Sequence, residues 1–161
     1  MVRAARRRPA VLFIGLDADP TRMRRASRHA PDNVLFVVAG AESLPPELDG
    51  SVSELSITFP WGSLLDGLVV PSPNVLESIA RVLVPAGALT ALLSITRLDG
   101  REPLGDASLD PAAYGRHGLE IVEWREAARA EIVAADSSWA KRLRAGDVRP
   151  AWLLRGLCSR S

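Results

Sequence analysis

The sequence has few of the residues on which metal clusters and acid–base catalysis usually depend. Only one cysteine and two histidines occur among 161 residues. A single cysteine can form neither an internal disulfide nor a cysteine-based metal cluster. The histidines show no metal-ligand spacing and no Ser/His/Asp arrangement. We therefore expect no metal site, a small buried residue at Cys158, and surface positions for His29 and His117.

Long hydrophobic runs are also lacking. No apolar run reaches the roughly 18 residues that a membrane span needs. The arginine-rich start, residues 1–8, is not followed by the apolar stretch and cleavage site of a signal peptide. The composition, 47% hydrophobic and 24% charged, is typical of a globular protein. We expect residues 1–161 to form one domain that acts as a monomer in the cytoplasm, without a membrane partner.

The charges are unevenly distributed along the chain, although the net charge is only +1. Residues 1–30 carry +6, residues 31–136 carry −10 and residues 137–161 carry +5. If the two basic ends meet in space, they would form a face that binds a phosphate backbone through counterion release. The alternative is a solvated helix surface with no partner.

Short apolar runs alternate with helical segments along the chain. Apolar runs predict strands at residues 11–16, 34–39, 52–59, 88–95, 119–124 and 151–157. Helical patterns occupy residues 21–30, 63–69, 73–84 and 111–117, with one or two more helices within 127–144. This alternation predicts an α/β domain with a parallel sheet and helices on both faces.

In such sheets, ligands bind beyond the carboxyl ends of the strands. Asp17 ends the first predicted strand, where an acid can accept hydrogen bonds from two ribose hydroxyls. It could instead serve as a helix cap or turn residue, but Asp19, directly before Pro20, is the expected cap of the next helix and so frees Asp17. Ala41 and Glu42 follow the second strand, where a backbone N–H and a carboxylate could bind the edge of an adenine ring. From that segment alone, a solvated loop is the better interpretation.

Two tryptophans stand out from the predicted core. Trp61 lies between Pro60 and Gly62 at the end of the third strand, where a rigid flat face is suited to stacking on a base. Trp139 lies beside a basic run. An aromatic ring that stacks on bases and cations that contact phosphates are together suited to binding RNA. The alternatives are that Trp61 packs under its own loop and that Trp139 faces the core of an amphipathic helix together with Leu143.

These segments together resemble the kanamycin–apramycin resistance (Kam/Npm) methyltransferases, which use S-adenosylmethionine (SAM) to methylate N1 of adenine 1408 in 16S rRNA. The similarity runs in order over nearly the whole chain. The Pro-Trp-Gly-Ser-Leu-Leu segment at 60–65 and the Ser-Ser-Trp segment at 137–139 are its more specific parts. It also covers residues 15–19, 22–23, 41–46 and 59, together with Arg142. The resemblance implies a Rossmann-like class I methyltransferase sheet, a 30S ribosomal subunit as partner and aminoglycoside resistance as outcome.

The resemblance also implies roles for individual residues. Asp17 would bind the ribose of SAM, and Ala41 with Glu42 would bind its adenine. Trp61 and Trp139 would be the catalytic pair that sandwiches the flipped target adenine. The methyl-transfer pocket would be walled by Phe59, Pro60, Trp61, Gly62 and Ser63, and shaped by Ser137 and Ser138. RNA would be held by Trp61, Trp139, Lys141, Arg142 and Arg149, whereas Asp147 replaces a basic residue of the family.

The start of the chain departs from the family pattern. Class I methyltransferases open with a strand and a glycine-rich turn, whereas residues 1–8 resemble the later part of the helix that follows them. We expect that strand to belong between the strands at 11–16 and 52–59, and residues 1–161 alone to be inactive and poorly stable. Two alternatives stay open: a class I methyltransferase for a small molecule or protein, and an inactive remnant that only binds RNA or a partner.

Overall fold

The protein folds into two compact units, residues 1–44 and 45–161. A computed structural model describes residues 1–143, 145–146 and 149–160, with the side chains of all of these except residues 22, 25, 138 and 139. The prediction of a single domain stays a prediction.

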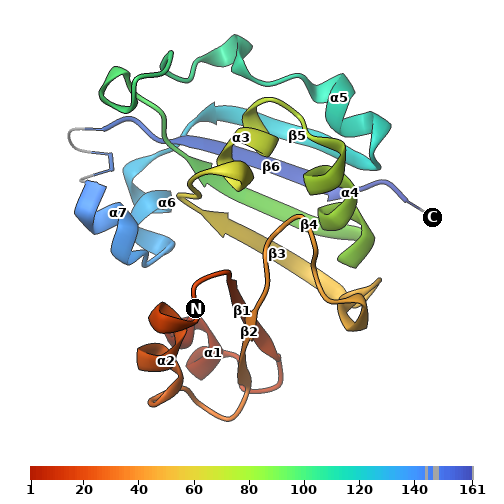
Figure 1. Ribbon diagram of the computed structural model, residues 1–161, viewed down its shortest axis with the longest axis vertical. Helices are drawn as coiled ribbons and strands as arrows, with labels where there is room; N and C mark the ends of the chain where they lie inside the picture. Colours follow the sequence, from red (N-terminus) through yellow and green to blue (C-terminus); the bar gives the residue numbers. More distant parts are fainter. Residues whose placement is uncertain (144, 147–148, 161) are drawn as a thin grey trace. The chain divides into compact units, whose positions relative to one another are not determined.

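The first unit holds a two-stranded parallel sheet. Its elements are α1 (Val2–Arg7), β1 (Phe13–Asp17), α2 (Pro20–Ser27) and β2 (Val34–Val38). β1 pairs with β2 from Phe13↔Val34 to Asp17↔Val38 (Figure 1). The amide nitrogen of Asn33 lies 2.8–3.1 Å from three carbonyl oxygens, those of Ala5, Arg8 and Val11. This side chain thus joins the end of α1 to the segment that enters β1.

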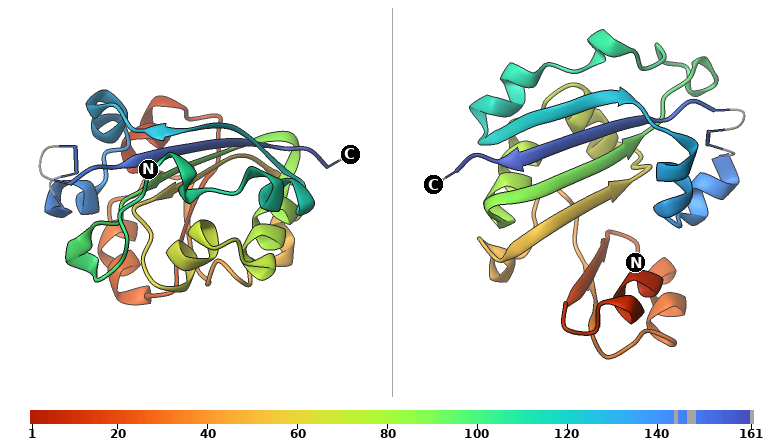
Figure 2. Two further views of the ribbon diagram at one scale, coloured as in Figure 1. Left: turned by 90° about the horizontal axis from the view of Figure 1, so that it is seen from above. Right: turned by 180° about the vertical axis from the view of Figure 1, so that it is seen from behind.

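The second unit holds a four-stranded sheet in the order β3-β4-β6-β5 (Figure 2). β3 is parallel to β4, whereas β6 is antiparallel to both of its neighbours. The elements are η1 (Pro46–Leu48), β3 (Val52–Thr58), α3 (Ser63–Val69), α4 (Pro73–Val82), β4 (Leu83–Leu93), η2 (Arg97–Asp99), η3 (Asp106–Ser108), α5 (Pro111–Arg116), β5 (Leu119–Glu126), α6 (Arg129–Ala134), α7 (Ser138–Leu143) and β6 (Trp152–Cys158). The first four strands pair in parallel as predicted, β1 with β2 and β3 with β4, and the antiparallel strand β6 makes the second sheet mixed.

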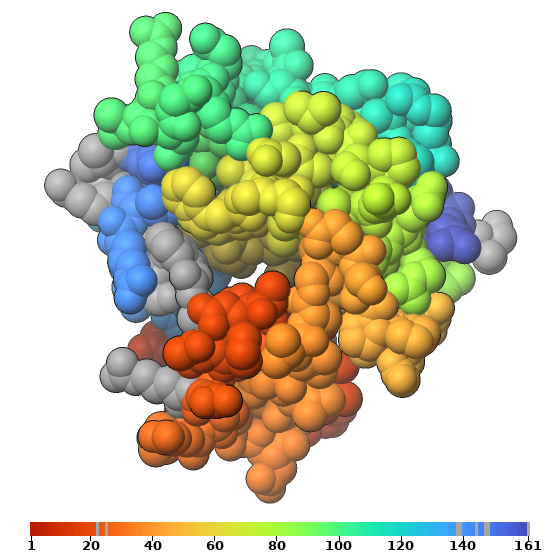
Figure 3. Space-filling model, in the orientation of Figure 1, coloured from red at the N-terminus to blue at the C-terminus, as the bar shows by residue number. Residues whose placement is uncertain are grey.

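Alternation along the strands gives this sheet two hydrophobic faces. Leu89 and Leu93 of β4 and Leu154 of β6 pack with the apolar sides of α3, α4 and α5. Leu92 of β4 and Leu153 of β6 point the other way and pack with α6 and α7. Figure 3 shows α3 and α4 side by side on one face of this unit. The predicted α/β class with helices on both faces of a sheet is confirmed.

The junction of α4 and β4 differs from the prediction. We expected the helix to run through Val84 and to stop at Pro85–Gly87. Instead α4 ends at Val82, and Leu83 already begins β4. The Pro-Ala-Gly segment forms an irregularity inside the strand, where the pairing jumps from Val52↔Leu83 to Glu54↔Ala88. A Cβ on Gly87 would lie 2.8 Å from the carbonyl oxygen of Val84, so a side chain does not fit there.

β1 and β3 each stand at the end of their sheet's strand order. Among the described residues, β1 pairs with β2 and β3 pairs with β4, and no ladder joins β1 to β3. These are the two strands between which we expected the first strand of the family fold to belong. In the described part of the chain, no helix has the length and apolar character needed to cross a bilayer.

A network of four charged side chains crosses the outer strands of the second unit. Arg125 of β5 lies 2.7 Å from Glu123 and 2.8 Å from Glu131 of α6. Arg155 of β6 lies 2.9 Å from Glu123 and 3.2 Å from Glu131. Hydrogen bonds from Arg125 and from the backbone N–H of Ala128 lower the pKa of Glu131 to about 2. This network ties the start of α6 to the sheet.

The network predicts a pH dependence of stability. Because the pKa of Glu131 is lower in the folded protein than in the unfolded chain, its carboxylate stabilises the fold above pH ~4.3. That contribution is lost as the pH falls toward 2. We expect Glu131→Gln to be less stable than the wild type at pH 7, with the difference shrinking between pH 4.5 and 2. Denaturant unfolding across this range measures it, with the exposed Glu120→Gln as control. A constant difference would contradict the assignment.

Candidate active site

The ribose- and adenine-binding residues predicted for SAM lie in the first unit. Asp17 is the last residue of β1, and its Oδ1 accepts a hydrogen bond from the backbone N–H of Asp19 at 2.9 Å. Asp19 in turn caps α2 by accepting from Thr21 at 2.9 Å. Asp19 is thus the N-cap of α2, as predicted. The Oδ1 of Asp17 accepts a bond within the loop, and the carboxylate of Asp17 is not needed to cap α2.

Ala41 and Glu42 lie in the loop that leaves β2, at the same end of the sheet as Asp17. The pairing Asp17↔Val38 puts both strand ends level, and the N–H of Ala39 donates to the carbonyl oxygen of Asp17 at 3.2 Å. Glu42 is exposed, and a Cβ on Gly40 would lie 3.1 Å from its Oε2. An acid at each of two adjacent strand ends is an arrangement suited to a nucleoside.

The loop after β3 has an unusual backbone. Phe59 is buried, and its N–H extends the β3–β4 ladder by donating to the carbonyl oxygen of Leu92 at 2.8 Å. Its φ of 51° is rare for an aromatic residue, and such a conformation costs of order 1–3 kcal/mol. After Pro60, Trp61 is 46% exposed, and Gly62 takes a φ of 61° before Ser63 begins α3. The turn at Phe59 therefore places an indole ring at the surface, as the sequence predicted.

The Ser137–Trp139 segment is held next to this loop by a shared hydrophobic cluster. Phe59 packs in one cluster with Ile132 of α6 and Ala140 of α7, and with Leu92, Ala151 and Leu153 of the sheet. The Oγ of Ser137 accepts from the N–H of Ala140 at 3.4 Å, at the start of α7. Ser138 and Trp139 are the first two residues of α7, and their side chains lie outside the described part of the structure. The two segments that the resemblance singles out thus meet at the carboxyl end of β3.

The predicted RNA-binding cations differ in their surroundings. Lys141 and Arg142 are exposed in the last turn of α7, and the Lys141 ammonium lies 3.6 Å from Asp136. Arg149 is instead largely covered, with 11% of its side chain exposed. Asp147, where the family has a basic residue, falls outside the described residues. Of the three predicted RNA-binding cations, Lys141 and Arg142 are therefore exposed at the surface, and Arg149 is not.

Arg149 is bound by residues that the sequence did not single out. Its Nε donates to the Oγ of Ser94 at 3.0 Å, and its Nη2 donates to Asp99, whose side chain is 13% exposed. The Arg149 guanidinium and hydrogen bonds from Thr96 lower the pKa of Asp99, against the effect of burial. The guanidinium also lies over the Trp61 ring, 5.8 Å from its centroid. The Thr96-x-x-Asp99 spacing predicts a capping turn, but nothing in it points to a partner 50 residues away.

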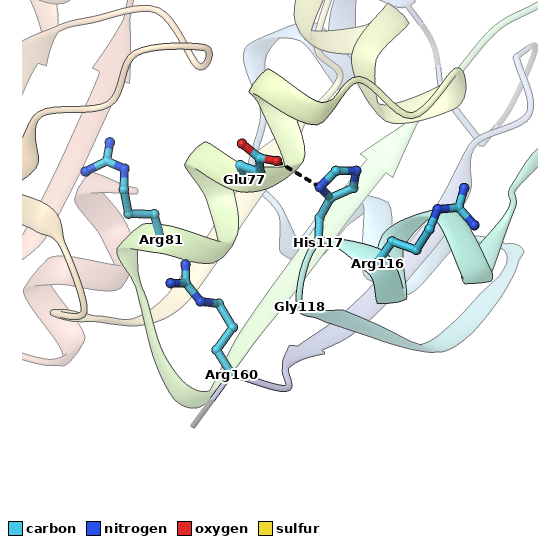
Figure 4. A pocket seen from close by; sticks show the side chains of 6 residues that line it. All are labelled: Glu77, Arg81, Arg116, His117, Gly118 and Arg160. Carbon is cyan, nitrogen blue, oxygen red and sulfur yellow. Dashed lines mark ion pairs between the residues drawn. The ribbon is translucent and has the colours of Figure 1, made fainter.

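A hollow of about 470 Å³ lies elsewhere in the second unit. Its lining comes from the end of α4, the turn before β5 and the segment after β6: Glu77, Arg81, Arg116, His117, Gly118 and Arg160 (Figure 4). These positions precede β4 and β5, whereas the Trp61 loop follows β3, so the hollow is at the opposite end of the sheet. His117 was expected at the surface, but its side chain is only 19% exposed, and its Nδ1 lies 3.2 Å from Glu77. None of the predicted site residues lines this hollow.

Carboxylates at the ends of β1 and β2 match the hydroxyls and amino group of an adenosine. A Cβ built on Gly62 would meet no atom within 4 Å, so the backbone of the Trp61 loop is accessible to a ligand. Among the described residues, no group of three or more potential metal ligands occurs. These observations suit an organic cofactor with a nucleoside part.

Comparisons with known proteins agree with this geometry. Residues 1–158 match the family described as NpmA: 16S rRNA (adenine(1408)-N(1))-methyltransferase. The chain belongs to this family. It is 35% identical over 161 residues to the 16S rRNA (adenine(1408)-N(1))-methyltransferase of Streptoalloteichus hindustanus, in a match that covers 88% of this chain and 73% of that protein. The family resemblance seen in the sequence is thereby confirmed.

Solved structures share the fold over nearly the whole chain. The antibiotic-resistance methyltransferase Kmr superposes with a TM-score of 0.78 at 31% identity, covering 99% of this chain and 81% of that one. A mutant of the 16S rRNA (adenine(1408)-N(1))-methyltransferase of Catenulisporales acidiphilia, solved with cosubstrate SAM, gives a TM-score of 0.84. That match covers 99% of this chain and 80% of the other at 21% identity, so it shows the fold alone. The class I methyltransferase fold is thus confirmed.

Proposed function

We propose that the protein is a SAM-dependent methyltransferase that modifies N1 of adenine 1408 in the 16S rRNA of the 30S subunit and so confers aminoglycoside resistance. One observation carries the proposal beyond family membership. The Phe59–Gly62 loop and the α6–α7 segment share a hydrophobic cluster at the carboxyl end of β3. This proximity of the two tryptophan-bearing segments supports the proposal that both tryptophans act on one base.

The reaction asks little of acid–base groups. Adenine N1 has a lone pair in the ring plane that attacks a methyl group directly, and one proton leaves afterwards. SAM supplies the activated methyl group as a sulfonium. The protein has to extrude the base, orient N1 toward the methyl and exclude other acceptors. Trp61, and by resemblance Trp139, would grip the two faces of the base, while Asp17 and Glu42 would hold the adenosine part of SAM.

The substrate that fits best is the assembled subunit. A lone adenine offers too little surface for the exposed cations of α7, Lys141 and Arg142, to contribute. A phosphate backbone would engage them, and binding should then weaken steeply with salt. We expect the protein to act as a monomer on this much larger partner.

The test is rRNA methylation. The protein is expressed in bacteria whose 16S rRNA lacks this modification, and their rRNA is isolated. Primer extension on 16S rRNA should stop at adenine 1408, since N1 methylation blocks base pairing. The Trp61→Ala, Trp139→Ala double variant is the control and should give read-through. If the protein methylates a small amine but leaves 30S subunits unmodified, the alternative of a methyltransferase for a small molecule is favoured.

A further inference from the structure

Arg149 is held in a fixed place by contacts from three directions. Its Nε bonds the Oγ of Ser94, which itself donates to the carbonyl oxygen of Pro150 at 2.7 Å. Its Nη2 bonds Asp99 at the end of η2. Asp99 also accepts from the N–H of Thr96 at 2.8 Å and from its hydroxyl at 3.1 Å. The guanidinium is thus the centre of a polar network that joins the end of β4, η2 and the entry to β6.

The network reaches Trp61 through the guanidinium. A planar cation over an indole is attracted by the ring's negative face, and Arg149 lies 5.8 Å from the centroid. With only 11% of its side chain exposed, Arg149 is less screened by water than Lys141 or Arg142. Trp61 stands between Phe59 and Gly62, two residues with positive φ that turn the chain, and its ring lies beside the Arg149 guanidinium.

We propose that Arg149 is a positioning residue, which holds the Trp61 indole in the orientation that receives the target base. The proposal rests on the proposed function, in which Trp61 stacks on the flipped adenine. Asp99 and Ser94 orient the guanidinium, the guanidinium covers one face of the indole, and the base stacks on the opposite face. Arg149 therefore acts through Trp61 and not as one of the surface cations that grip phosphates.

Two conservative changes separate positioning from phosphate binding. Arg149→Lys keeps the positive charge but loses the planar fork that bonds Asp99 and Ser94 and stacks on the ring. Asp99→Asn leaves Arg149 intact but removes the charge that orients it. A positioning role predicts that both variants behave like Arg149→Met. A phosphate contact predicts that Arg149→Lys and Asp99→Asn stay close to the wild type.

The experiment uses the full protein and two readouts. The indole N–H signal of Trp61, assigned with Trp61→Phe, is followed by NMR without any RNA. Methylation of 30S subunits is followed as kcat and KM, together with 30S affinity at several salt concentrations. Arg116→Met serves as control, because Arg116 is exposed at the opposite end of the sheet. Thermal unfolding checks that each variant is folded.

We expect the Trp61 signal to shift or broaden in Arg149→Met, Arg149→Lys and Asp99→Asn but not in Arg116→Met. In the same three variants kcat/KM should fall about 2- to 30-fold, with an unchanged salt dependence of 30S binding. An unmoved Trp61 signal would overturn the proposal. So would a loss confined to Arg149→Met with a salt slope reduced by about 1, or a rise in kcat/KM that shows the guanidinium competing with the base. A protein that leaves rRNA unmodified would refute the proposed function, while the NMR signal still decides whether Arg149 holds Trp61.

Discussion

Replacing Trp61 or Trp139 by alanine is expected to remove most rRNA methylation while SAM affinity changes little. Base–aromatic stacking is worth roughly 1–3 kcal/mol per base, which corresponds to about 5- to 150-fold in affinity for the flipped state. Losing one face also lets the adenine tilt, so that N1 no longer points at the methyl group. The double variant should therefore lose more than either single one.

The matched variants are Trp61→Phe and Trp139→Phe, which keep a flat ring and should retain part of the activity. A second contrast comes from Trp124 and Trp152, which stack on each other with centroids 4.9 Å apart and pack against the core. Trp152→Ala should lower the melting temperature. The measurements are methylation rate, calorimetric SAM binding and thermal unfolding. If Trp61→Ala and Trp139→Ala lose SAM affinity and lower the melting temperature as much as Trp152→Ala does, Trp61 and Trp139 belong to the core.

The sequence was most informative where one pattern has one structural solution. Short apolar runs predicted β1, β2 and β3 to within two residues at each end. Asp19 before Pro20 predicted the cap of α2, which is confirmed. The Val82–Val84 run fits a helix end and a strand start equally well, because three consecutive apolar residues can be buried in either element. The boundary of α4 was therefore misplaced, and only the pairing with β3 decides it.

The site was predictable in its outline but not in its contacts. A tryptophan between proline and glycine at a strand end predicted an exposed ring, and Trp61 is 46% exposed. The sequence could not show that Arg149 turns inward to Asp99, since the two residues are 50 positions apart and meet only through tertiary packing. Arg149 was grouped with the RNA-binding cations because the family resemblance puts a basic residue that holds RNA at its position. The exposure of a residue in a turn can be predicted from its neighbours in the sequence. Contacts between side chains that are distant in the sequence depend on the order of the strands and cannot be predicted in that way.

Replacing Asp17 by alanine is expected to weaken SAM binding about 10- to 150-fold. A carboxylate that accepts hydrogen bonds from ribose hydroxyls contributes about 1.5–3 kcal/mol, and Asp17 ends β1 where a nucleoside would lie. Glu42→Ala should weaken binding in the same direction through the adenine part. Methylation should fall with affinity and recover at high SAM concentration, because neither residue touches the target base.

Asp19→Ala is the matched control for this prediction, because Asp19 lies two residues from Asp17 in the same loop. Asp19 caps α2 through the N–H of Thr21, and its own N–H remains available to Asp17 after the substitution. Losing the cap should reduce the free energy of unfolding by about 0.5–2 kcal/mol and leave SAM affinity nearly unchanged. Calorimetric titration with SAM and denaturant unfolding on all three variants separate the two effects. Equal losses of SAM affinity in Asp17→Ala and Asp19→Ala would mean that Asp17 shapes the loop instead of binding the ribose.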